Sequence, residues 1–335
     1  MHIHITDFGC SLGKKSERLV VKDKGKVKEE YPFFNVETVT VDSRGVSLSS
    51  DVIRECMEHG IQINFLSGSG KPYAKLSSPN LTGTVITRRE QILAYIDERS
   101  VVLGKTFVEG KLKNQANLLK YFSKYRKSAG KEIYHQIVSG IEKIGKIQAE
   151  LKDVNGRSID EARGILLSIE GRGANTYWNT LGLIMEDRID FPGREHRGTT
   201  DPFNSLLNYG YGILYQQVWG AVLLAGLEPF AGFLHVDRPG KPSLILDLVE
   251  EFRQPIVDRT VVAMVNKGTE VKMDDNGLEQ KTRKELAAKI IERLETPVLF
   301  EGKKTKLKHI IQKQSRRLAM FLRGQAKYRC FVSSW

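Results

Sequence analysis

The pattern of apolar residues changes part-way along this chain of 335 residues, and that change strongly constrains the fold. Up to residue 76, short runs of alternating apolar and polar residues predict β-strands, for example over residues 2–6, 18–22 and 36–41. Beyond residue 86, apolar residues recur every three to four positions over long segments, which predicts helices.

The stretch between them, residues 77–84, reads SSPNLTGT, a composition typical of a linker. We therefore predict an α+β protein: a small β-rich N-terminal domain over residues 1–76, a linker over 77–86, and a larger, mainly α-helical C-terminal domain over 87–335. In the second domain, Thr87 and Glu90 have the spacing of a capping box and predict one helix running through Leu103 and past Lys111.

Residues 232–253, GFLHVDRPGKPSLILDLVEEFR, combine a strongly apolar helix with three carboxylates. The spacing of Asp247, Glu250 and Glu251 predicts that they share one helix face. Buried carboxylates repel one another unless a cation or strong hydrogen-bond donors compensate. A divalent metal with His235 as a nitrogen ligand is one solution, and a pair of arginines is the other.

A further acidic residue, Glu170, follows an apolar run and precedes Gly171, Gly173 and Ala174. Small residues allow another backbone or a ligand to approach closely. Arg172 lies beside the acid, so an ordinary salt bridge is the alternative to a functional site.

Cysteine usage narrows the choice of metal. The three cysteines, Cys10, Cys56 and Cys330, are scattered, which is typical of a reducing cytoplasm and argues against a thiolate zinc site. Any metal must then be held by His, Asp and Glu, and an oxygen-rich set favours Mg²⁺ or Mn²⁺. The sequence lacks an apolar run long enough for a transmembrane helix, so we expect no membrane partner.

The net charge of +12 is concentrated at the C-terminal end, where residues 301–335 contain ten basic residues and one acidic residue. Such a bias favours a polyanionic partner, nucleic acid above all, although a merely solvated basic surface is the alternative. We expect the last residues, 328–335, to be mobile.

Four features occur in a particular order behind the β-rich region: Glu170 beside glycines, an Asp-Pro-x-Asn helix start at residue 201, the GFLH segment ending at His235, and the DLVEEFR segment. This ordered set resembles the CRISPR-associated protein one family, the integrases of spacer acquisition, over essentially the whole chain. The resemblance implies Glu170, His235 and Glu250 as catalytic metal ligands with Asp247 in support, and leaves open whether Asp247 or Glu250 binds the metal directly.

The resemblance also implies an activity and partners. The expected protein is a metal-dependent DNA endonuclease and integrase, which joins the 3′-OH ends of a prespacer duplex to a CRISPR repeat by transesterification. It would act as a homodimer with a small partner, CRISPR-associated protein two, with the N-terminal domain as a dimerisation scaffold. Two other functions stay open: a structure-selective nuclease of branched DNA, and a DNA-binding scaffold without catalysis.

Polar and basic residues near these segments are candidates for holding DNA phosphates. The candidates are Arg172, Arg194, Arg197, Asn204, Arg238, Lys241 and Arg253.

Overall fold

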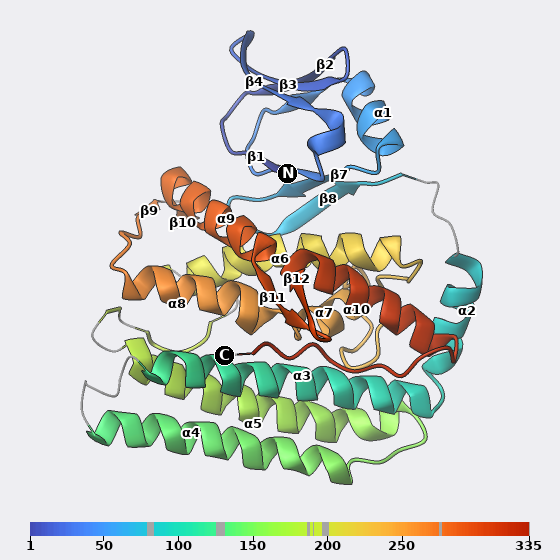
Figure 1. The fold of residues 1–335 in the computed structure, drawn as a ribbon, viewed down its shortest axis with the longest axis vertical. Helices are drawn as coiled ribbons and strands as arrows, with labels where there is room; N and C mark the ends of the chain where they lie inside the picture. Colours follow the sequence, from blue (N-terminus) through green and yellow to red (C-terminus); the bar gives the residue numbers. More distant parts are fainter. Residues whose placement is uncertain are drawn as a thin grey trace.

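The computed structural model describes residues 1–78, 84–124, 131–185, 188–189, 191–195, 201–274 and 277–334. It has a β-rich N-terminal region at one end and a mainly helical region below it (Figure 1). This architecture confirms the predicted α+β class. None of the helices in these ranges combines the length and the apolarity needed to cross a lipid bilayer.

The N-terminal region contains two four-stranded sheets and one α-helix. Its elements are β1 (His2–Ile5), β2 (Ser11–Lys15), β3 (Arg18–Asp23), β4 (Lys26–Pro32), η1 (Phe33–Asn35), β5 (Thr38–Val41), β6 (Ser47–Leu48), α1 (Ser50–Glu58), β7 (Gln62–Leu66) and β8 (Pro72–Leu76). One sheet has the order β1-β5-β7-β8, with β1, β5 and β7 parallel, and the other has the order β4-β3-β2-β6. Their buried faces form a hydrophobic core separate from that of the helices.

The helical region is built around two groups of helices. Its elements are α2 (Thr84–Ala94), α3 (Glu98–Ser123), α4 (Lys131–Ala149), η3 (Glu150–Asp153), α5 (Ile159–Met185), α6 (Pro202–Leu224), α7 (Ser243–Val249), a π-helical segment η4 (Arg253–Asp258), α8 (Arg259–Asn266), β9 (Met273–Asp274), β10 (Gly277–Leu278), α9 (Gln280–Glu295), β11 (Pro297–Phe300), β12 (Lys303–Lys306) and α10 (Leu307–Leu322). Helices α3, α4 and α5 all pack against one another in one group, and α6 packs against α7, α9 and α10 in the other (Figure 1).

The prediction of a single helix beginning at the Thr87 capping box is wrong. Helix α2 ends at Ala94, and a separate helix, α3, begins at Glu98. The Asp97 carboxylate accepts a hydrogen bond from Arg99 N at 2.9 Å and caps α3. Thr87 is buried within α2 and accepts a hydrogen bond from Arg323 instead. Residues 79–83 of the predicted linker lie outside the described residues.

The C-terminal tail is folded against the body, contrary to the mobility expected for residues 328–335. Tyr328 and Phe331 are buried, and the tail runs alongside α3 (Figure 1). Two side chains of α3 hold it: Asn114 donates to Phe331 O at 2.8 Å, and Asn117 donates to Ser333 O at 2.8 Å. Trp335 lies outside the described residues.

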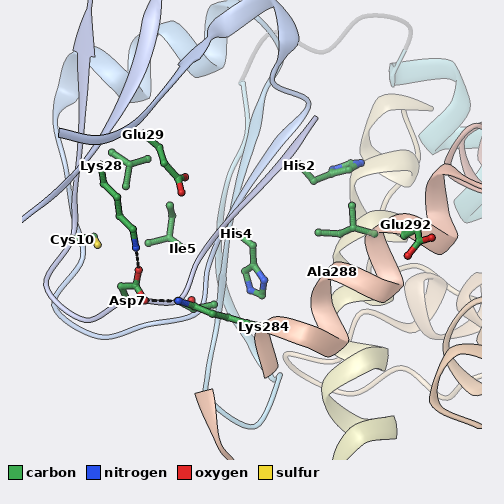
Figure 2. Close-up of a pocket in the computed structure, with 13 residues that line it drawn as sticks. His2, His4, Ile5, Asp7, Cys10, Lys28, Glu29, Lys284, Ala288 and Glu292 are labelled. Atoms are coloured by element: carbon green, nitrogen blue, oxygen red, sulfur yellow. Dashed lines mark hydrogen bonds and ion pairs between the residues drawn. The ribbon is translucent and has the colours of Figure 1, made fainter. Parts of the chain in front are cut away.

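The two regions meet through polar contacts and one very close backbone approach. A cavity of about 560 Å³ lies between β1 and α9, where Lys284 donates to Asp7 at 2.6 Å (Figure 2). The turn before β8 presses on α6 so closely that a Cβ at Gly212 would lie 1.7 Å from Gly70 O. Glycine is therefore required at this crossing.

Candidate metal and nucleic-acid site

Glu170 lies near the middle of α5, on the side of that helix facing α3, and its side chain is 23% exposed. Its carboxylate pairs with Lys111 of α3. The neighbouring Arg172 pairs with a different acid, Glu150, at 2.9 Å, so the simple salt bridge considered between Glu170 and Arg172 is wrong.

Lys111 is the functional candidate that the sequence analysis missed. Its side chain is only 8% exposed, and its Nζ contacts the Glu170 carboxylate and lies 2.7 Å from Glu250 Oε2. The available signal was its place on the buried stripe of α3, four residues after Phe107 and seven before Leu118. Burial opposes the charged form, but Glu250 and Glu170 outweigh it and raise the pKa of Lys111.

The three carboxylates of the acidic segment do not share one face, contrary to the prediction. Helix α7 ends at Val249, and the chain passes through a turn into η4, where Pro255 has no N–H to continue a regular helix. Glu250 therefore faces Lys111 and Arg253, whereas Glu251 faces the C-terminal tail. Each acid obtains its own partners.

Glu250 is 3% exposed and lies between two cations, with Arg253 Nη1 3.0 Å from its Oε1. Burial alone would raise the pKa of Glu250, but Arg253, Lys111 and then His235 lower it to about 2. The group is thus an anion at neutral pH. Its Oε2 is buried and lies against the Lys111 ammonium, so this oxygen is not free to bind a metal while that ion pair persists.

Asp247 is fully buried and holds the His235 loop. One of its oxygens accepts hydrogen bonds from Phe233 N at 2.6 Å and Leu234 N at 3.1 Å. The other accepts from His235 N at 2.9 Å and lies 2.7 Å from His235 Nδ1. A carboxylate can only accept, so Nδ1 carries a proton, and in the neutral imidazole this tautomer leaves the lone pair on Nε2. Asp247 therefore orients His235, which leaves Glu250 as the better candidate for direct metal binding.

The ligand atoms of Glu170, His235 and Glu250 are not gathered within one coordination distance. In the described ranges, the groups of His and acidic atoms within 4.8 Å of one another are His2–Glu37–Glu295 and Glu17–Glu55–His59. Each of these contains a glutamate that pairs with a lysine, Lys308 or Lys14 respectively. A metal bound by all three residues would therefore need at least one of these ligand atoms to move closer to the others.

The predicted phosphate-binding residues fall into two groups. Arg172 and Arg238 are exposed, and Lys241 is partly exposed on the loop after His235. Arg197 lies outside the described residues.

The other group is engaged inside the protein. Asn204 is fully buried and accepts hydrogen bonds from Arg194 Nη1 at 2.9 Å and Glu195 N at 3.0 Å. Arg253 lies 4.9 Å from the centre of the Tyr211 ring and pairs with Glu250. These contacts hold the loop and the site in position. The side chains of Arg194, Asn204 and Arg253 are therefore engaged with other residues of the protein and do not project from its surface as Arg172 and Arg238 do.

A family model described as CRISPR associated protein Cas1 matches residues 3–292. The curated "CRISPR-associated endonuclease Cas1 1" of Archaeoglobus fulgidus is 35% identical over 348 residues, covering 100% of each chain. The chain belongs to the Cas1 family.

Two solved structures share this Cas1 fold. A structure titled "Casposase bound to integration product" has a TM-score of 0.82 and 23% identity, and covers 99% of this chain and 93% of its own. A chain of a "Cas6-RT-Cas1--Cas2 complex" has a TM-score of 0.79 and 19% identity, and covers 99% of this chain and 36% of its own. The resemblance to Cas1 stated from sequence is confirmed over the whole chain.

Proposed function

We propose that this Cas1 family member is a metal-dependent DNA endonuclease and integrase of CRISPR adaptation. The observation that carries the proposal is the pairing of Glu170 and Glu250, from separate elements, around one buried cation beside an oriented histidine. The Archaeoglobus relative is named an endonuclease, and the structural neighbour of highest TM-score quoted above is bound to an integration product.

Glu170, Glu250 and Nε2 of His235 would hold Mg²⁺ or Mn²⁺, because two carboxylates and one imidazole suit hard divalent ions. Such an ion, when bound, supplies charge stabilisation to a phosphodiester under attack. The chain's own contribution is to position the ligands. Asp247 fixes the His235 tautomer, and Arg253 keeps Glu250 ionised.

The reaction would be a transesterification. The 3′-OH oxygen of a prespacer strand forms a new bond to a phosphorus at the repeat boundary and loses its proton. The bond from that phosphorus to the leaving 3′ oxygen breaks, and this oxygen takes up a proton. Arg172 and Arg238, which are exposed, and Lys241, which is partly exposed, would hold phosphates of the double-stranded prespacer and repeat. We further propose a homodimer that works with the small CRISPR-associated protein Cas2, as the Cas1–Cas2 neighbour suggests.

A joining assay tests this function. The full-length protein is mixed with a short duplex bearing free 3′-OH ends and a supercoiled plasmid carrying a CRISPR repeat, with Mg²⁺, Mn²⁺ or EDTA, with and without Cas2. We expect metal-dependent joining that falls at least ~100-fold in Glu170→Ala, His235→Ala and Glu250→Ala. Glu161→Gln, an exposed change on the same helix α5, is the matched control and should keep full joining.

Other outcomes distinguish the competing functions. Nicking without joining, even with Cas2, would favour a nuclease of branched DNA. Tight DNA binding with no product under any metal would leave a scaffold.

A further inference from the structure

Lys111 occupies the position between the two carboxylates that a metal ion would bridge. Its ammonium contacts Glu170 on α5 and Glu250 beyond α7, and both pairs are largely shielded from water. One positive charge therefore neutralises two acids that come from separate elements.

The backbone around Lys111 is fixed by close packing, so this position is built into the fold. A Cβ at the neighbouring Gly110 would lie 2.8 Å from Cys330 Cβ, and one at Gly173 of α5 would lie 2.1 Å from Leu112 Cδ2. Helix α3 thus has no room to slide on either side of the lysine. Only the flexible side chain of Lys111 can leave the carboxylates.

A buried ammonium is costly unless it neutralises anions, and two carboxylates facing each other are costly unless a cation lies between them. The remaining nearby cation, Arg253, contacts only Glu250 among these two acids. Without Lys111, Glu170 would have no cation in contact among the described residues. The lysine is therefore the group that keeps both acids in place when no metal is bound.

We propose that Lys111 is an internal counterion that holds Glu170 and Glu250 together in the metal-free protein and that an incoming divalent ion must displace. Metal and ammonium compete for the same carboxylate oxygens, so the lysine weakens metal binding while it stabilises the metal-free fold. Lys111 is a positioning residue in this scheme. The inference rests on the proposed metal site, and its test separates the two.

The test measures Mn²⁺ affinity of the full-length protein, without DNA, from the electron paramagnetic resonance signal of free Mn²⁺. Lys111→Met keeps an unbranched side chain, one heavy atom shorter, and removes its charge. We expect it to bind Mn²⁺ at least ~10-fold more tightly than wild type, and to melt at a lower temperature in EDTA with a larger upward shift on adding Mn²⁺. Lys113→Met, on the same helix but 38% exposed and paired with Glu109, is the control and should match wild type.

Should Lys111→Met fold poorly, the double variant Lys111→Met with Glu170→Gln provides the second measurement. Removing both charges should raise the melting temperature in EDTA above that of Lys111→Met alone. Such a rise would identify the uncompensated carboxylate of Glu170 as the cause of the lost stability. Unchanged or weaker Mn²⁺ binding by a folded Lys111→Met, or no recovery in the double variant, would overturn the counterion role. If Glu170→Gln does not weaken Mn²⁺ binding in the wild-type background, the proposed metal site itself is wrong.

Discussion

His4 of β1 and Asp42, which follows β5, are buried neighbours at the junction of the two regions, with His4 Nε2 3.9 Å from Asp42 Oδ2. Burial, with the charges of Arg283 and Lys284, lowers the pKa of His4 to about 4. Burial raises the pKa of Asp42 to about 6, against its hydrogen bond from Tyr209 and the charge of Arg283. Both groups are therefore held neutral at the junction around pH 5.

These shifts act in opposite directions on stability. Between about pH 4 and 6 the unfolded chain loses the Asp42 proton that the folded chain keeps, so this acid lowers the free energy of unfolding as pH rises. Over about pH 4 to 6.5 the unfolded chain binds a proton at His4 that the folded chain does not, so the histidine raises the free energy of unfolding as pH rises. In wild type the two contributions largely cancel.

Asp42→Asn should remove this cancellation. The free energy of unfolding of the variant, relative to wild type, is expected to rise with pH from about 4 to 6 by up to ~1.4 kcal/mol per pH unit. Urea unfolding at pH 4.5 and 6.0 measures it, with the exposed Asp153→Asn as control. Parallel pH dependence in wild type and Asp42→Asn would contradict the assignment.

At the scale of elements, the C-terminal tail, the α7–η4 turn and α3 form one packed unit behind the site. Glu251 accepts hydrogen bonds from Gln314 Nε2 at 2.9 Å and Phe331 N at 2.8 Å. Asn114 of α3 donates both to Glu251 O and to Phe331 O. The tail therefore supports the backbone of the residue next to Glu250.

Phe331→Ala tests this support. The ring is 1% exposed and stacks on Phe252 with centres 5.5 Å apart, so its loss should cost about 3–5 kcal/mol of unfolding free energy. Trypsin should also cleave faster after Lys327 and Arg329 in the variant. Ser334→Ala, at an exposed position, is the control. Rapid cleavage at these two sites in wild type would show that the tail is not held.

At the scale of the whole molecule, fewer of the basic residues in the C-terminal segment are free to bind DNA than their number suggests. In the C-terminal segment, Lys306 pairs with Glu295 at 2.8 Å, and Lys308 lies 2.6 Å from both Glu37 and Glu295. Lys308 thereby ties α10 to the N-terminal region. Part of the basic segment is therefore a structural connection, which neither the predicted nucleic-acid surface nor a merely solvated basic surface anticipates.

The loop after His235 is a better candidate for DNA contact. Arg238→Ala and Lys241→Ala should each reduce the slope of log affinity against log salt concentration for a DNA duplex by roughly one. Fluorescence anisotropy over a salt series measures the slope, and Arg54→Ala, exposed on α1, should leave it unchanged. An unaltered slope in both loop variants would exclude them as phosphate contacts.

The local sequence determined the types of secondary structure and the start of α6, because these depend on periodicity and spacing within a few residues. The β-rich start and helical remainder follow from hydrophobic period, and the Asp201 cap of α6 follows from local hydrogen bonding: its carboxylate accepts from Asn204 N at 2.6 Å. The ordered set of Glu170, His235 and the acidic segment was enough to identify the family.

Only the tertiary structure decided the partners of buried charges, since these come from residues far apart in the chain. Lys111 lies 59 positions before Glu170, and no local pattern links them. The break at Asp97, the division of Asp247, Glu250 and Glu251 among three environments, and the docking of the tail on Asn114 each depend on packing between distant elements. Burial makes these long-range pairings obligatory, because an ion or hydrogen-bonding group without a partner is costly once water is excluded.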